Sequence, residues 1–107
     1  MDEHLIDKTL REIVSRIVQA THPIRIILFG SAARGEMKGH SDLDILVVVP
    51  SGTHRRHTAQ MIYRKLFGVD LPVDIVVITE EDIELYKDNP GMVIKPALED
   101  GRVIYAA

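Results

Sequence analysis

Hydrophobic and polar residues follow one another along this chain in two different rhythms, and each rhythm predicts a type of element. Over residues 5–18 the apolar side chains recur every three or four positions, with charged side chains on the opposite side. That spacing predicts an amphipathic helix. We expect this helix to end near Ala20, because Pro23 disfavours helical geometry in the residue before it.

Three runs that are rich in β-branched and aliphatic residues predict strands. They cover residues 24–29, 43–49 and 73–78. The tail is more mixed: residues 92–100 predict a helix, in which Pro96 either introduces a kink or marks the first turn. Gly101 then precedes a short final strand over residues 102–105.

Helical signals also lie on both sides of the third strand. Residues 54–67 gather apolar side chains on one side, and Gly68 is placed to end that helix. Thr79, followed three residues later by Asp82, resembles a capping box and predicts that a short helix begins there and runs through Tyr86.

The order of these elements predicts how the strands pair. The strands at 43–49 and 73–78 are joined by a helix, so they should be parallel neighbours with a right-handed crossover. The strand at 24–29 reaches the next one without a helical crossover, which favours an antiparallel pair. The predicted fold class is therefore α/β, in the α+β sense, with a small mixed sheet flanked by helices.

Composition narrows the class of protein. The 107 residues have room for one compact domain, which we expect to span residues 1–107. With 46% hydrophobic and 27% charged residues the chain is an ordinary globular one. Its net charge of -3 provides no global positive field, so we expect no direct binding to nucleic acid or to an anionic membrane.

Compartment and metal chemistry are limited by what the sequence lacks. There is no cysteine, which excludes disulfides and thiolate metal sites. The start of the chain does not resemble a signal peptide, and no apolar run approaches the roughly 20 residues that a bilayer-spanning helix needs. We therefore expect a cytoplasmic protein.

Three acidic residues should meet at one edge of the predicted sheet. Asp42 and Asp44 stand at the start of the second strand, where residues two apart face the same way. Asp74 stands at the start of the third strand, which begins at the same edge. Three neighbouring carboxylates repel one another unless a cation offsets their charge. Oxygen ligands of this kind favour Mg²⁺ or Mn²⁺.

A site for a triphosphate is expected beside these acids. In a two-metal site Asp42 and Asp44 would bridge both ions, and Asp74 would bind the first ion and help to take the acceptor's proton. Gly30 permits a close approach of the backbone to a nucleotide, and the Ser31 hydroxyl can bond a phosphate oxygen. Arg34 would supply positive charge, with Lys38 as a second candidate.

Each of these signals also has an ordinary explanation. A glycine and serine after a strand usually form a turn, and an Asp-x-Asp at a strand start is usually a solvated strand end. Asp74 is harder to explain in this way, because a carboxylate within so apolar a strand needs either an exposed end or a partner. The combination is stronger than its parts, since independent accidents would rarely agree on one sheet edge.

The same residues resemble a known family, the minimal nucleotidyltransferases of the DNA polymerase beta superfamily. The resemblance is carried by Phe29-Gly30-Ser31-Ala32-Ala33-Arg34-Gly35-Glu36, by Ser41-Asp42-Leu43-Asp44-Ile45 and by Val73-Asp74-Ile75. Ten residues separate the Gly-Ser pair from the Asp-x-Asp, as in the family signature. The resemblance implies a polymerase-beta-like mixed sheet flanked by helices, Mg²⁺, and ATP or another nucleoside triphosphate as donor. By position, Gly30 and Ser31 would contact the nucleotide and the three acids the metals.

The resemblance also implies a partner. Small members of this family are commonly paired with a HEPN-domain protein, a helical ribonuclease toxin, and the chain would then be an antitoxin that attaches AMP to a tyrosine hydroxyl of that toxin. Two alternatives remain open: an antitoxin that neutralises its partner by binding alone, and a transferase that acts on a small molecule. The chain has no evident acceptor-binding domain, which favours an acceptor carried by another protein.

Several other polar residues have simpler interpretations. The basic cluster at residues 54–57 is expected to be a solvated helix face, and His40 a loop histidine. Tyr63 and Tyr86 are expected to pack with their hydroxyls pointing outward, and Tyr105 belongs either to an exposed edge or to an interface.

Overall fold

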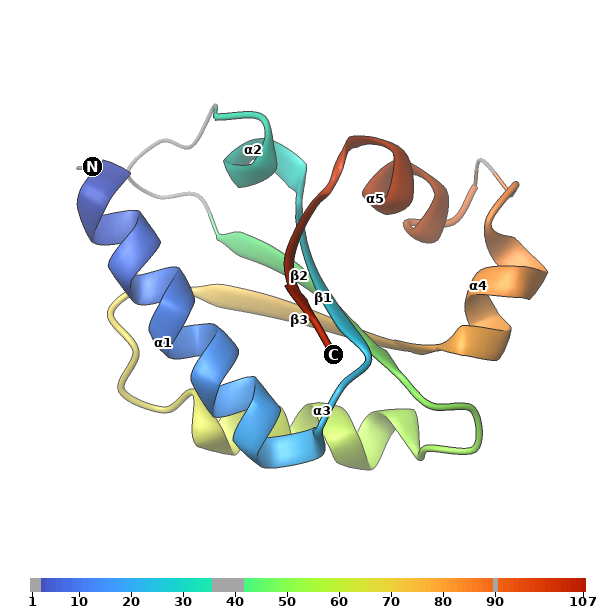
Figure 1. Cartoon of the computed structure of the whole chain (residues 1–107), viewed down its shortest axis with the longest axis horizontal. Helices are drawn as coiled ribbons and strands as arrows, with labels where there is room; N and C mark the ends of the chain where they lie inside the picture. Colours follow the sequence, from blue (N-terminus) through green and yellow to red (C-terminus); the bar gives the residue numbers. More distant parts are fainter. Residues whose placement is uncertain (1–2, 36–41, 90) are drawn as a thin grey trace.

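Four strands form a single sheet in the order β3-β2-β1-β4, as seen in a computed structural model that describes residues 3–35, 42–89 and 91–107. The strands are β1 (Arg25–Phe29), β2 (Leu43–Val49), β3 (Val73–Thr79) and β4 (Arg102–Ala106). Figure 1 shows the sheet running through the middle of the molecule with helices on both sides. The predicted small mixed sheet flanked by helices is confirmed.

The pairing of β1, β2 and β3 also agrees with the prediction. β1 and β2 are antiparallel, and Phe29 pairs with Asp44. β2 and β3 are parallel neighbours, and Asp44 pairs with Asp74. β4 lies antiparallel on the other edge of β1, with an irregularity between Ile26 and Ile27. The place of β4 in the sheet had not been predicted.

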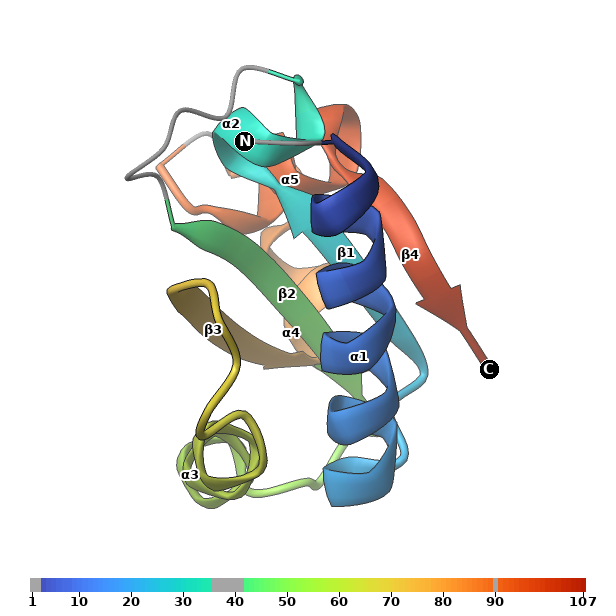
Figure 2. The same ribbon diagram turned by 90° about the vertical axis from the view of Figure 1, so that its left-hand side faces the viewer.

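The helices divide between the two faces of the sheet. Helix α1 (Glu3–Thr21) and helix α3 (Arg55–Lys65) cover one face, while α4 (Glu80–Tyr86) and α5 (Ile94–Asp100) lie against the other (Figures 1 and 2). A short helix, α2 (Gly30–Ala33), follows β1 directly. In the part of the chain that the structure describes, no helix is long and apolar enough to cross a membrane.

Alternating side chains of the strands supply the two halves of the core. On the α1 side, odd-numbered residues of β2 such as Ile45 and Val47 pack with Ile13 and Ile17. On the other side, Leu46 and Val48 pack with apolar residues of α5. Strand β2 is therefore buried on both faces, as expected for a central strand that has helices on both sides of the sheet.

Several of the predicted helix ends are confirmed. α4 begins with a capping box, in which the Thr79 hydroxyl accepts a hydrogen bond from Asp82 N at 3.1 Å and the Asp82 carboxylate accepts one from Thr79 N at 2.9 Å. Gly68 has a φ of +90°, suited to the chain turn after α3. Pro96 lies in the first turn of α5, the second of the two predicted roles.

One element departs from the sequence prediction. No helix was predicted after Gly30, yet residues 30–33 form α2. Four residues span little more than one turn, which is too short for a hydrophobic period to reveal it.

Candidate active site

The three candidate acids lie at the edge of the sheet where β2 and β3 begin. Asp42 directly precedes β2, Asp44 is the second residue of β2, and Asp74 is the second residue of β3. Asp44 and Asp74 are direct partners in the parallel ladder. By strand alternation both lie on the face that Leu46 and Val48 turn towards α5. The predicted meeting of the strand starts is thus observed at the level of the backbone.

Gly30 lies directly against Asp44, one of this pair of acids. It follows β1 and has a φ of +71°, a backbone conformation that other residues rarely adopt. A Cβ placed on Gly30 would lie 3.2 Å from Cγ of Asp44 and would overlap Oδ2 of the same carboxylate. Because Gly30 has no side chain, the Asp44 carboxylate can occupy this space. The predicted role of Gly30 in leaving room for a nucleotide would be additional.

The remaining predicted contacts of the nucleotide follow along α2. Ser31 is the second residue of α2 and is half-buried, and α2 contacts both β1 and β2. Arg34 is the exposed C-cap residue of the same helix. The chain thus brings Gly30 and Ser31 to the acidic edge and places Arg34 one turn further on. Lys38 and His40 lie outside the described residues.

Electrostatic repulsion is built into this edge. The pKa of Asp44 is raised above its usual value, first because the carboxyl is partly removed from water and then because Asp74 and Asp42 lie near it. Of the ion pairs Arg16–Glu12, Arg55–Asp82, Lys87–Glu84 and Lys95–Glu99 in the described part of the chain, none involves one of the three acids. The fold thus brings the negative charges of Asp42, Asp44 and Asp74 close enough to affect one another.

The donor set fits a hard divalent cation but is not a closed cage. Within residues 3–35, 42–89 and 91–107, no three histidine or acidic side chains are grouped closely enough to hold one metal ion between them. Mg²⁺ keeps several waters and takes other ligands from substrate phosphates, so a complete protein cage is not required. Carboxylate oxygens that repel one another suit such an ion. The assignment of Asp42, Asp44 and Asp74 as metal ligands stays a prediction.

Tyr63 contacts this edge, and sequence analysis missed it. Its hydroxyl was expected to point outward, but it accepts a hydrogen bond from Ile75 N at 2.9 Å and lies 3.4 Å from Oδ1 of Asp74, within donating distance. The expectation for Tyr63 was therefore wrong. Only the strand order reveals the reason: β3 is the outermost strand, so its outer backbone groups need partners from another element.

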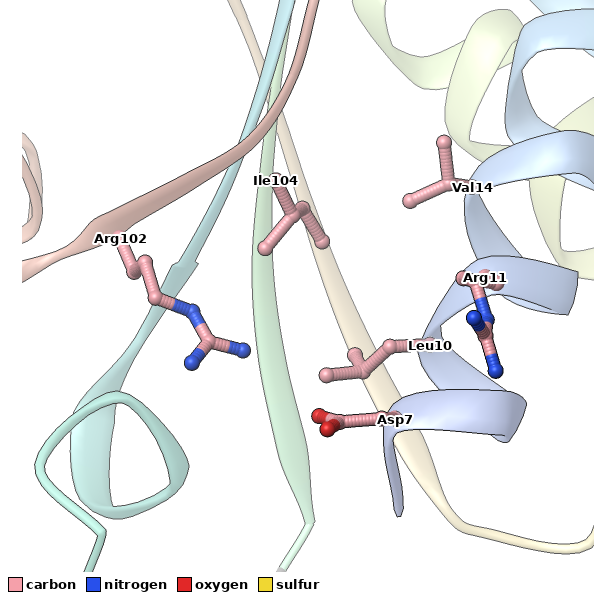
Figure 3. A pocket seen from close by; sticks show the side chains of 6 residues that line it. All are labelled: Asp7, Leu10, Arg11, Val14, Arg102 and Ile104. Atoms are coloured by element: carbon pink, nitrogen blue, oxygen red, sulfur yellow. The ribbon is translucent and has the colours of Figure 1, made fainter. Parts of the chain in front are cut away.

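A separate hollow of about 380 Å³ lies between α1 and β4. Figure 3 shows the Asp7 carboxylate and the Arg102 guanidinium extending into it from opposite sides. Its apolar lining comes from Leu10, Val14 and Ile104. The hollow lies on the α1 side of the sheet, opposite the acids, and contains none of them. It is therefore not the site to which the acids belong.

Comparison with known proteins agrees with the geometry. The family described as "Nucleotidyltransferase domain" matches residues 7–104. The chain is 29% identical over 97 residues to a protein of Methanocaldococcus jannaschii named "Putative protein adenylyltransferase", covering 84% of this chain but only 66% of that relative. A crystal structure described as a "putative nucleotidyltransferase" from Sulfolobus solfataricus superposes with a TM-score of 0.63 at 24% identity, over 92% of this chain and 78% of the other. At 24% identity the Sulfolobus solfataricus structure supports the fold alone.

Proposed function

This chain belongs to the nucleotidyltransferase domain family, and on that premise we propose that it transfers AMP from ATP to a hydroxyl group of a protein acceptor. One observation carries the proposal. Asp44 and Asp74 are paired across two parallel strands, and Gly30 lies against Asp44 where the chain leaves β1. A carboxylate pair beside a glycine turn is what a metal-assisted transfer of a phosphorus group requires.

The residues of this edge have distinct tasks in the reaction. Asp42, Asp44 and Asp74 would hold Mg²⁺, which when bound neutralises phosphate charge and activates the attacking oxygen. The backbone at Gly30 and the Ser31 hydroxyl donate hydrogen bonds to phosphate oxygens. Arg34 adds positive charge beside the triphosphate.

Asp74 accepts the proton of the acceptor hydroxyl as its oxygen bonds to the α-phosphorus. The bond from that phosphorus to the oxygen bridging to the β-phosphate breaks at the same time, and pyrophosphate leaves. The products are an AMP-modified acceptor and pyrophosphate, so atoms and charge balance. The carboxylate of Asp74 returns to its ionised form when the proton passes to water.

The acceptor is a tyrosine hydroxyl of a HEPN ribonuclease toxin, for which this chain serves as the antitoxin. The name of the Methanocaldococcus jannaschii relative supports a protein acceptor. The resemblance to minimal nucleotidyltransferases supports the toxin as partner. The exposed apolar side chains of Phe67 and Leu85 offer contact area to another protein.

Mass spectrometry tests the proposal directly. The chain is purified together with the protein that co-purifies from its host, incubated with ATP and Mg²⁺, and both components are weighed intact. We expect the partner to gain one or more AMP units. A mass gain on a small-molecule acceptor with no second protein present would favour the small-molecule alternative, and no transfer with any nucleoside triphosphate would refute enzymatic activity.

A pair of variants separates catalysis from binding. Asp42→Asn combined with Asp44→Asn removes two of the proposed ligands, whereas Asp88→Asn changes an exposed acid far along the chain and serves as the matched control. We expect the double variant to lose both AMP transfer and protection of cells from the toxin. Protection that survives in the double variant would show that neutralisation occurs by binding alone.

A further inference from the structure

The phenol of Tyr63 joins helix α3 to the start of strand β3. Its side chain is 45% exposed, yet the hydroxyl is not left to water. It accepts a hydrogen bond from Ile75 N at 2.9 Å, and Oδ1 of Asp74 lies 3.4 Å away. One hydroxyl thus contacts two successive residues of β3, one through its backbone and one through its carboxylate.

The two contacts have defined directions. A phenol has one proton to give and accepts through its lone pairs. Because Ile75 N–H donates to the oxygen, the phenol proton is the one left to donate, and the Asp74 carboxylate is the acceptor within reach. The firm bond to the backbone fixes the hydroxyl, and the longer bond then fixes one oxygen of Asp74.

We propose that Tyr63 is a positioning residue, which holds Asp74 so that its second carboxylate oxygen is presented to the metal and the acceptor. This inference rests on the proposed function of Asp74. Hydrogen-bond partners behind a metal ligand orient it, and losing them weakens metal binding. A carboxylate that rotates freely would present either oxygen to the metal in several orientations. When Tyr63 holds one oxygen of Asp74, the other oxygen has a fixed position from which it can bind the metal.

The test compares Tyr63→Phe with Tyr86→Phe, and the first measurement needs no turnover. Tyr86 lies on α4, is 37% exposed, and within the described chain its hydroxyl makes no hydrogen bond, so it is the matched control. Binding of Mn²⁺ is measured on the whole chain by electron paramagnetic resonance. We expect Tyr63→Phe to raise the dissociation constant by about tenfold, the low end of the range for a lost partner behind a metal ligand, because the bond to Asp74 is long at 3.4 Å. Tyr86→Phe should match wild type.

Kinetics and a double-mutant cycle test whether the role of Tyr63 is purely structural. Tyr63→Phe should lower kcat by about three- to tenfold at saturating Mn²⁺ while KM for ATP changes little, because the contact is to Asp74 and not to the nucleotide. In an Asp74→Asn background the same substitution should cost no further Mn²⁺ affinity. Equal losses in both backgrounds would overturn the inference, as would a variant that is less heat-stable but binds Mn²⁺ like wild type.

Three further outcomes would each have a different meaning. Wild-type protein that neither binds Mn²⁺ nor transfers AMP would refute the proposed function and this role together. Wild-type activity that Tyr63→Phe leaves unchanged would refute the role of Tyr63 alone. AMP found on Tyr63 itself by peptide mass spectrometry would also overturn the inference, since the phenol would then be an acceptor.

Discussion

The carboxylates near the two ends of the β2–β3 pair have opposite electrostatic surroundings. Where the strands begin, Asp44 and Asp74 lie side by side, and partial burial together with repulsion from Asp74 and Asp42 raises the pKa of Asp44. Beyond the end of β3, Asp82 accepts a hydrogen bond from Thr79 N at 2.9 Å and pairs with Arg55 at 3.0 Å. Asp82 is therefore held by groups of opposite charge or polarity, whereas Asp44 lies beside acids of its own charge.

The difference separates a structural acid from a functional one. Asp82 is balanced by groups of its own chain, and its role ends with the start of α4. At the other end Asp44 lies near Asp74 and Asp42, and the repulsion between these charges is a cost that a bound cation would offset. Sites of this kind are expected to lower stability in exchange for activity.

The largest effect should come from Asp44→Asn. We expect AMP transfer to fall by at least about a hundredfold, because even the outer partners of a metal ligand contribute about ten- to a hundredfold. The melting temperature without metal should stay level or rise, since the substitution removes one of the repelling charges. Steady-state transfer and calorimetry measure the two quantities. A variant that loses stability as well as activity would place Asp44 among the structural acids.

Gly30→Ala should have the next largest effect. The new Cβ would overlap the Asp44 carboxylate and would stand at a φ of +71°. We expect about a tenfold loss of transfer and a loss of about 1–3 kcal/mol of stability from backbone strain and displacement of Asp44.

Gly52→Ala is the matched control for Gly30→Ala. Gly52 has a φ of +91°, and a Cβ there would meet nothing within 4 Å. This variant should show the backbone strain alone, with full activity. If both variants transfer AMP equally well, the contact between Gly30 and Asp44 has no role in the reaction.

Asp82→Ala should lower stability and leave AMP transfer intact, the opposite of what we expect for Asp44→Asn. It removes half of the capping box and the partner of Arg55, so we expect a loss of about 1–2 kcal/mol in the free energy of unfolding. The capping bond accounts for most of this, because Arg55 is well exposed and the ion pair is screened by water. Transfer per folded molecule should remain. Urea unfolding followed by circular dichroism provides the measurement, and a drop in activity at full stability would contradict it.

The smallest effect should be a pH dependence that belongs to Asp44. A carboxyl whose folded pKa is raised binds protons more readily in the folded state than in the unfolded state. The metal-free protein should therefore lose stability as the pH rises from about 4, the unfolded value, through the raised folded pKa. Asp44→Asn should lack this component, and Mg²⁺ should diminish it in wild type. Thermal unfolding at a series of pH values checks both points.

The sequence was sufficient to predict that Asp44 and Asp74 are neighbours, because their pairing depends only on local rules. A helix between two apolar strands implies a parallel pair, and parallel strands begin at one edge, so Asp44 and Asp74 had to be neighbours. The cap at Thr79 was equally local. These features need no knowledge of strand order.

What escaped prediction depends on contacts between distant parts of the chain. The bond from Tyr63 to β3 exists because β3 is an outermost strand, and no period in the sequence indicates which strand is outermost. The place of β4 beside β1 is likewise decided by tertiary packing. The contact between Gly30 and Asp44 required both the antiparallel register of β1 and the turn into α2.

The parallel register of β2 and β3 makes this enzyme its own indicator of correct folding. Side chains alternate along a strand, so one extra residue inserted before Asp74 within β3 would send its carboxylate to the opposite face while leaving the strand apolar. Such a molecule would be compact and helical by spectroscopy and yet inert. An activity assay therefore measures the fraction of molecules in which β2 and β3 are paired in the correct register. Measurements of helix content or overall size would not detect the difference.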